Sequence, residues 1–215
     1  MSTPRTAASP RPATAERRRD ILRAALEIFG AKGYHNGPLA EIAEQVGMTH
    51  AGILHHFGSK DRLLVEVLRY RDESDVEAIE GQHIPDGTAL FAHLVRTAFM
   101  NEARPGIVQA YAVLSAESVT EDNPGRPWFE ERYRVLRREV ATAFRIMCAE
   151  QGVESSDAVD AAAASILAVM DGLQVQWLLD PEDVSLSRAS AFAIEAIAAQ
   201  VIEPRSAPFA RAEPA

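Results

Sequence analysis

The spacing of apolar residues is the strongest constraint on what this chain of 215 residues can fold into. It follows the 3.6-residue period of the α-helix through almost every segment. Prolines at positions 38, 85, 105, 124, 127 and 181 separate these segments. No run alternates β-branched and polar residues as a half-buried strand does. We therefore predict an all-α fold of about nine helices.

The predicted helices are separated by proline, glycine or short polar connections. In chain order they cover about residues 14–31, 38–46, 49–56, 60–80, 88–103, 105–120, 127–151, 155–180 and 185–202. Gly33 is the predicted stop of the first helix. The predicted apolar faces include Leu63, Leu64, Val67 and Leu68 in 60–80, Leu136 and Val140 in 127–151, and Ala189, Phe192, Ala196, Ile197 and Val201 in 185–202. Residues 1–14 are rich in Ser, Thr, Ala and Pro, and residues 204–215 hold three prolines. We expect a disordered arm at 1–14 and a disordered tail at 204–215.

Charge is distributed unevenly along the chain. The formal net charge is −9, which alone would argue against a nucleic-acid partner. Residues 1–70, however, carry 10 Lys/Arg and 7 Asp/Glu, whereas residues 71–215 carry 12 and 24. A basic N-terminal part ahead of an acidic remainder is typical of a DNA-binding module attached to a domain that avoids DNA.

Cysteine usage and hydropathy indicate a cytoplasmic protein. Cys148 is the single cysteine, so no disulfide can form within one chain. We interpret it as a buried small residue. No stretch approaches the roughly 18 uninterrupted apolar residues of a membrane span. Arg23 and Glu27 interrupt the first apolar run, which excludes a signal peptide.

Residues 38–56 are predicted to form a helix, a tight turn and a second helix. Pro38 suits the first helical position, Gly47 suits a turn with positive φ, and Thr49 suits an N-cap. This is the layout of a helix-turn-helix, whose second helix enters the major groove of DNA. The alternative is a pair of short core helices that bind nothing.

The segment RRRDILRAALEIFGAKGYHNGPLAEIAEQVGMTHAGILHHFGSKDRLLVEVL resembles the N-terminal domain of the TetR family of transcriptional regulators. The match covers about 50 residues without a gap. It includes the AALEIF and GY of the first helix, the IA of the second, and GM-T-x-G-x-L-x-x-HF-x-SK-x-x-L. MDGLQVQWLLDP, LSAES and NPGRPWFEERY suggest one of the sensor-domain subtypes of the family.

The resemblance implies a homodimer with a DNA-binding domain at 15–60 and a helical effector-binding and dimerisation domain at 61–203. The helices near 155–180 and 185–202 would form the subunit interface. A lysine at the start of the fourth helix would contact phosphate, as would the helix N-terminus itself. With the basic run before the first helix, the expected DNA-binding residues are Arg17, Arg18, Pro38, Thr49, His50, Ala51, Gly52, His55, His56 and Lys60.

Two positions depart from the family pattern. An aromatic residue, most often tyrosine, usually occupies the position of His55, and Thr or Ser is common near Pro38. His55 could contact DNA or pack beneath the recognition helix.

A zinc site is not expected, because His55 and His56 lie at about 140° and 240° around the helix axis from His50. The arginines at 17–19 could contact phosphate or form a solvated face.

The effector is expected to bind in the 88–180 region, where aromatic and polar residues could line a pocket or form core. Gln174 could bind ligand or bond across the dimer, since burial without a partner costs about 1–3 kcal/mol. Glu117 and Asp171 could receive a cationic effector or pair with an arginine. The candidates are Phe91, Phe99, Tyr111, Glu117, Trp128, Tyr133, Met147, Met170, Gln174 and Trp177.

An enzyme is not indicated, because the sequence has no Gly-rich phosphate loop, HExxH or GxSxG motif. We expect no cofactor and no bound metal. A helical small-molecule-binding protein without a DNA role is the main alternative, and an architectural nucleoid protein is another. We predict that the protein is a repressor, and that an unidentified small molecule releases it from a palindromic operator. The helix from Lys60 to about Glu80 would act as the lever between the domains.

Overall fold

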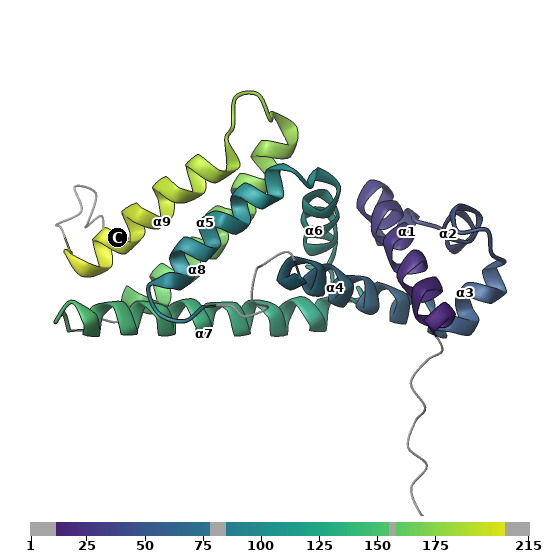
Figure 1. The fold of residues 1–215 in the computed structure, drawn as a ribbon, viewed down its shortest axis with the longest axis horizontal. Helices are drawn as coiled ribbons and strands as arrows, with labels where there is room; N and C mark the ends of the chain where they lie inside the picture. Colours follow the sequence, from purple (N-terminus) through teal and green to yellow (C-terminus); the bar gives the residue numbers. More distant parts are fainter. Residues whose placement is uncertain (1–11, 78–84, 155–157, 205–215) are drawn as a thin grey trace, which may run out of the picture.

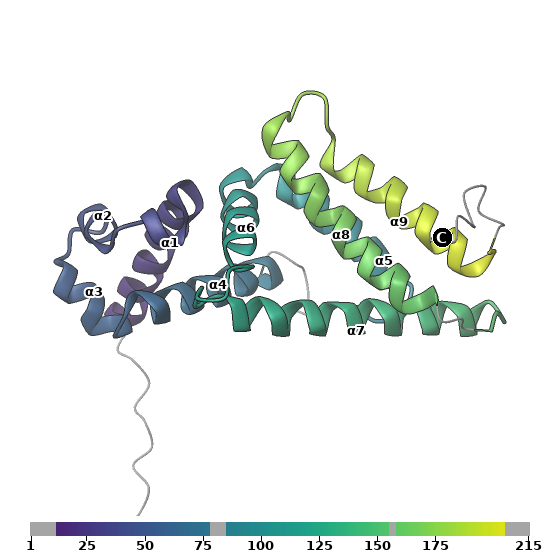
Figure 2. The same cartoon turned by 180° about the vertical axis from the view of Figure 1, so that it is seen from behind.

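The computed structural model describes residues 12–77, 85–154 and 158–204. Within these ranges every regular element is a helix, which confirms the all-α prediction. Figures 1 and 2 show an elongated molecule. Three helices lie together at one end of the molecule: α1 (Pro12–Asn36), α2 (Leu39–Gln45) and α3 (His50–Phe57). The helix α4 (Lys60–Glu77) leads from them towards the remaining five.

The other end is built from the C-terminal helices. They are α5 (Ala89–Glu102), α6 (Pro105–Glu117), α7 (Arg126–Glu150), α8 (Ala158–Leu179) and α9 (Leu186–Ile202). In both views α7 runs along one side of the molecule, while α5, α8 and α9 rise from it at an angle. The helix α6 stands between this group and α1.

The predicted helices differ from the observed ones mainly at their ends. The first helix begins at Pro12 instead of Thr14, so the end of the expected disordered arm is helical. Gly33, the predicted stop, has φ 76° and ψ 169°, and the chain kinks there. Residues 1–11 and 205–215, which include most of the arm and tail, lie outside the described residues, as does Glu80.

Local capping explains where the short helices begin. The Thr49 side chain accepts a hydrogen bond from the backbone N–H of Gly52 at 3.1 Å, as predicted for an N-cap. Ser185 caps α9 through the N–H of Arg188. Pro38 is the N-cap of α2, in an extended conformation, and not its first helical residue as predicted.

The first hydrophobic core joins α1–α4 to α6 and α7. The apolar face of α4 contributes Leu63, Leu64, Val67 and Leu68, all buried as the sequence predicts. This core continues across the expected domain boundary at residues 60 and 61. Its members from the C-terminal part are Ala110, Tyr111, Leu114 and Phe129.

A second core lies among α5, α7, α8 and α9. It buries Phe144 and Ile166 completely and also encloses Cys148, which is 1% exposed. By length and composition α8 could cross a membrane, a feature that the sequence analysis did not find. In this structure eight α8 side chains are buried, as expected of a helix at the centre of a helical domain.

The helix α9 buries a face that matches the predicted one only in part: Val201 is buried as predicted, and Ile197 packs against the second core. Leu186, Ser190, Ile194 and Val201 face the interior. Phe192, expected in the core, is instead 76% exposed. The prediction was wrong because α9 carries apolar or small residues on two faces, and periodicity does not select between them.

Candidate DNA-binding surface and ligand cavity

The helix-turn-helix is held by a small set of buried side chains. Ile42 of α2 and Ile53 of α3 are almost completely buried, and Phe57 anchors the end of α3. Gly47 lies in the turn with φ 63°, the left-handed conformation that the sequence predicts and that glycine adopts without strain. The face of α3 opposite these side chains is therefore presented to solvent.

Most of the expected DNA-binding residues lie on this exposed surface. His50, Ala51 and His55 are exposed on α3, and Gly52 and His56 are half-buried. The other exposed residues of the set are Arg17, Pro38 and Thr49. The exposure of His55 removes the alternative that it packs beneath the recognition helix. Its ring contacts that of His56 edge-on, with centroids 5.9 Å apart.

Arg18, one of the residues expected to contact phosphate, has three partners within the protein. Its guanidinium donates to Glu66 Oε2 at 2.7 Å and to the backbone oxygen of His56 at 3.0 Å. It also lies over the Phe57 ring, 4.2 Å from the centroid. These contacts fasten α1 to α3 and α4, so Arg18 positions the recognition helix. Arg17 remains exposed and donates to the Val46 oxygen at 3.2 Å.

Lys60 begins α4 at the point where α1 ends. Its Nζ donates to the backbone oxygen of His35 at 3.3 Å and lies 4.7 Å from the centroid of the Tyr34 ring. Partial burial lowers the pKa of the Lys60 ammonium, against the opposing charges of Glu117 and Asp61. The ammonium is thus close to the protein surface and is held by the end of α1.

Glu117 also contacts the end of α1. Its Oε2 accepts a hydrogen bond of 2.6 Å from the backbone N–H of Tyr34, which ties the end of α6 to the end of α1. The Tyr34 hydroxyl in turn donates to Asp61 of α4. Glu117, expected to receive a cationic effector or to pair with an arginine, here joins the two parts of the molecule and does not line the cavity described below.

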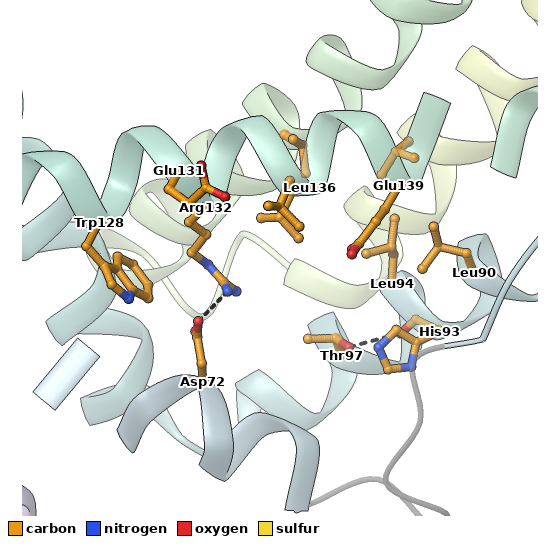
Figure 3. A pocket seen from close by; sticks show the side chains of 13 residues that line it. Asp72, Leu90, His93, Leu94, Thr97, Trp128, Glu131, Arg132, Leu136 and Glu139 are labelled. Atoms are coloured by element: carbon orange, nitrogen blue, oxygen red, sulfur yellow. Dashed lines mark hydrogen bonds and ion pairs between the residues drawn. The ribbon is translucent and has the colours of Figure 1, made fainter. Parts of the chain in front are cut away.

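A cavity of about 450 Å³ lies between α7 and α5, with the middle of α4 at one side. This volume is within the roughly 300–1,000 Å³ of small-molecule sites. Apolar side chains form most of its wall, and charged residues lie at intervals along α7, as Figure 3 shows. The lining residues are Asp72, Leu90, His93, Leu94, Thr97, Trp128, Glu131, Arg132, Val135, Leu136, Glu139, Val140 and Leu167.

Arg132 lines one end of the cavity, and Arg71 lies nearby outside the lining; both guanidinium groups lie over aromatic rings. Arg132 forms an ion pair with Asp72, drawn as a dashed line in Figure 3, and lies 5.4 Å from the Trp128 ring centroid. Arg71 is 5% exposed and lies 4.4 Å from the ring centroid of Tyr111. Cation–π contacts of this kind strengthen when water is excluded.

A half-buried carboxyl group lies close to these arginines. Asp171 of α8 accepts a hydrogen bond of 2.6 Å from the Tyr133 hydroxyl. Burial raises the pKa of the Asp171 carboxyl, opposed by that hydrogen bond and by the charges of Arg71 and Arg132. Burial also raises the pKa of the Tyr111 and Tyr133 hydroxyls. Asp171 thus serves as the structural partner of Tyr133, beside the two arginines.

Of the ten predicted effector residues, Trp128 alone belongs to the lining of this cavity. Phe99 is 63% exposed on α5, so it is neither core nor cavity wall. Gln174 is buried, and its Oε1 has no hydrogen-bond partner among the described residues. The remaining apolar and aromatic candidates are mostly core residues. Phe91, Met147 and Met170 belong to the second core, Tyr111 to the first, and Trp177 to a small cluster with Ala98, Val108 and Leu186.

The charged residues that line the cavity were not predicted from the sequence as ligand contacts. Arg132 and Glu139 interrupt the apolar stripe of α7, and His93 interrupts that of α5. Charged residues inside an apolar stripe could have indicated a cavity wall. Leu136 and Val140 were predicted only as members of the α7 stripe, because periodicity does not separate a packed face from a hollow one.

No group of three or more metal-binding side chains occurs in the part of the chain that the structure describes.

The fold and the two sites together define a class: a helical DNA-binding regulator with a helix-turn-helix at one end and a cavity-bearing domain at the other. Residues 21–67 match the model of the bacterial regulatory proteins of the tetR family. Residues 88–201, more than half of the chain, match the BetI-type transcriptional repressor C-terminal domain.

The chain belongs to the TetR family and is a DNA-binding transcriptional regulator. It is 26% identical to the regulator BetI of Rhizobium meliloti over 81% of this chain and 84% of that protein. It is 36% identical to the repressor AcnR of Corynebacterium jeikeium over 31% of this chain and 36% of AcnR. These matches disfavour a binding protein without a DNA role.

Solved structures agree with the fold. A transcriptional regulator of Saccharomonospora viridis, in complex with choline, has a TM-score of 0.66 and 25% identity. The match covers 85% of this chain and 96% of that one. SmeT, the repressor of the Stenotrophomonas maltophilia multidrug efflux pump SmeDEF, has a TM-score of 0.67, with 87% and 91% covered. At 17% identity, SmeT supports the fold alone.

Proposed function

We propose that the protein is a dimeric repressor that binds a palindromic operator and releases it when a small molecule occupies the cavity between α5 and α7. The observation that carries this proposal is the course of α4. Its first residue, Lys60, lies beside the helix-turn-helix, and Asp72 lines the cavity. These residues are about 18 Å apart along one helix. A ligand that moves Asp72 therefore acts on the element that supports α3.

The DNA contacts would come from the exposed face of α3 and from the residues beside it. His50, Ala51 and His55 would face base edges, and Thr49 and His56 would lie at the rim. Arg17, Pro38 and Lys60 are the proposed backbone contacts, because basic groups and helix N-termini attract phosphate. A dimer would place two such helices roughly 34–36 Å apart, in successive major grooves.

The last two helices would form the dimer interface. The outer faces of α8 and α9 are rich in small residues, which allow close approach, and they expose three large apolar side chains. Val175 is 47% exposed, Phe192 76% and Leu179 82%. Apolar patches rimmed by polar residues mark interaction sites in soluble proteins. Pairing with a second copy would bury these groups in a four-helix arrangement.

Release from DNA would follow from a population shift. An effector changes operator affinity only if it binds the DNA-incompetent arrangement more tightly than the competent one. The ion pair between Asp72 and Arg132 joins α4 to α7 across the cavity and is a contact that a ligand could break. The choline complex of the Saccharomonospora viridis regulator supports a small-molecule effector here. We assign no catalytic activity to the chain and place the protein in the cytoplasm.

Selection of bound duplexes from a random DNA pool at physiological salt tests the proposal. We expect enrichment of one palindrome, bound about 10³-fold more tightly than unrelated DNA. A co-purified effector could mask this result, so the selection is repeated after unfolding and refolding. A refolded dimer that still enriches no sequence would overturn the proposal. Enrichment of bent or AT-rich DNA without a consensus would indicate an architectural protein.

A further inference from the structure

The ligand cavity is chemically different at its two ends. Trp128, Arg132, Leu136 and Val140 follow one another at one-turn intervals along α7, and Glu139 lies beside the last of them. Seven residues of helix separate Arg132 from Glu139, or about 10 Å along the axis. Figure 3 shows the Arg132–Asp72 pair at one end and Glu139 at the other, with Leu136 between them.

Glu139 carries the uncompensated charge of this cavity. The other two carboxylates in the lining have cationic partners: Asp72 pairs with Arg132, and Glu131 pairs with Arg134. Among the residues that the structure describes, no hydrogen bond or ion pair involves the Glu139 carboxylate. Figure 3 shows its carboxylate directed from α7 towards the α5 side of the cavity. A carboxylate in a largely apolar hollow favours a cationic partner.

The α5 side of the cavity supplies groups that suit such a cation. The Thr97 hydroxyl donates to the backbone oxygen of His93 at 3.0 Å, which leaves the hydroxyl oxygen as an acceptor. Leu90 and Leu94 line the same end. A protonated amine there could donate to Glu139 and Thr97 while its carbon chain lies against leucine side chains.

The aromatic end is less suited to a cation. Trp128 is in cation–π contact with Arg132, and Tyr111 with both Arg71 and Arg132. These rings thus already interact with positive charges of the chain itself. A second cation placed against them would have to compete with the guanidinium groups that already lie over these rings. The charge pattern therefore directs a ligand's cationic group to Glu139 and its uncharged part towards Trp128.

We infer that the effector is an elongated primary or secondary amine with an apolar body, whose ammonium group is bound by Glu139. This inference rests on the proposed function, in which the cavity between α5 and α7 is the effector site. It deepens that function by naming the ligand class and the residue that selects it.

Three probes of the same length and different charge test the inference: octylamine, octanol and octanoate. Binding to the refolded full-length protein is measured by calorimetry at pH 7, with choline as a fourth, short cation. We expect octylamine to bind at least about tenfold more tightly than each of the others. In the variant Glu139→Gln, octylamine should lose about tenfold in affinity, while octanol should change less than twofold.

Glu131→Gln is the matched control, because it removes a carboxylate of the same lining that is exposed and paired with Arg134. It should leave octylamine binding within about twofold of the wild type. Three results would overturn the inference. Octylamine could lose the same affinity in both variants, octanoate or choline could bind more tightly than octylamine, or Glu139→Gln could leave the affinity for octylamine unchanged. Circular dichroism of each variant establishes that it is folded.

Operator release is measured separately, with the palindrome from the DNA selection. Octylamine could bind in a manner that depends on Glu139 and yet leave the operator occupied. This result would uphold the ligand class and contradict the proposed release mechanism. Failure to bind any operator would contradict the proposed function, whereas the calorimetric result would still decide whether Glu139 selects a cation.

Discussion

Gly33 and Glu117 form the contact through which α6 holds the end of α1. Gly33 has φ 76° and ψ 169°, a combination that is almost restricted to glycine. A side chain at this position would also overlap the Glu117 carboxylate, which is bound to the next backbone N–H, that of Tyr34. Glycine is thus required by the backbone conformation, and a side chain here would also displace the Glu117 carboxylate.

The variant Gly33→Ala should lose at least about 2 kcal/mol in the free energy of unfolding, because it adds backbone strain and displaces Glu117. Gly47→Ala is the control, since Gly47 has φ 63° but nothing within 4 Å of an added Cβ. It should cost about 1–2 kcal/mol. Urea unfolding measures both. Equal losses would contradict the prediction that Gly33 tolerates a side chain less well than Gly47.

Asp171 makes stability depend on pH. Because burial raises the pKa of its carboxyl in the folded protein, the native state binds more protons than the unfolded state between the unfolded and folded pKa values. The contribution of this group to stability therefore falls as pH rises through that interval. It is the reverse of the usual behaviour of a salt-bridged carboxylate.

We expect Asp171→Asn to remove this pH dependence. The stability of the variant relative to the wild type should increase as pH rises from about 4 to 7. Urea unfolding at several pH values measures the difference. Tyr133→Phe is the control, because it removes the hydrogen bond to Asp171 and keeps the carboxyl, so its pH dependence should persist. A constant difference between Asp171→Asn and the wild type would contradict the prediction.

At the scale of elements, α3 and the start of α4 have separate proposed tasks on DNA. His55 is exposed on α3, and Lys60 is held by the backbone oxygen of His35. Lys60→Ala should weaken binding to all DNA sequences and reduce the salt slope by about one. His55→Ala should reduce preference for the selected palindrome and leave the slope nearly unchanged. Fluorescence anisotropy over a range of salt concentrations measures both.

A slope that Lys60→Ala does not change would show that Lys60 acts only within the protein, as a link between α4 and α1. Unchanged sequence preference in His55→Ala would remove His55 from the base-contacting set. The two results are independent, because one reports counterion release and the other reports the discrimination between duplexes.

Element boundaries were predictable where local chemistry decides them. The cap at Thr49, the turn at Gly47 and the break at Gly33 are properties of a few neighbouring residues. The buried face of α9 was not predictable in the same way. Phe192 and Ile194 are two residues apart and both apolar, yet one is 76% exposed and the other 3%. Packing against α5 and α8 selected the face, and that choice depends on distant parts of the chain.

At the scale of the whole molecule, the exposed apolar groups of α8 and α9 are the proposed contact with a second copy. Phe192→Glu should convert the dimer to a monomer and abolish tight operator binding, since burying an unpaired charge is costly. Analytical ultracentrifugation measures the mass. Val119→Glu is the control: Val119 is also 76% exposed but follows α6, away from α8 and α9. A dimeric Phe192→Glu protein would place the interface elsewhere.

The cavity illustrates what a one-dimensional pattern omits. Aromatic residues were predicted as ligand contacts, but most of them are buried in the cores. Large rings are found there because burying their apolar surface lowers the free energy of the folded state most. Trp128 alone of the predicted set joins the cavity lining. Asp72, His93 and Glu139 come from three different helices, so only the packing of α4, α5 and α7 brings them to one space.

By itself the sequence determined the helical class, the positions of the helices, the helix-turn-helix and the family. These depend on the apolar period, on caps and turns, and on a motif of about 50 consecutive residues, all of which act over short separations. The tertiary structure decided which side chains of each helix are buried, that Arg18 and Glu117 hold the molecule together, and where the cavity lies. Those features depend on contacts between residues 38 to 83 positions apart, and no local pattern encodes such a contact.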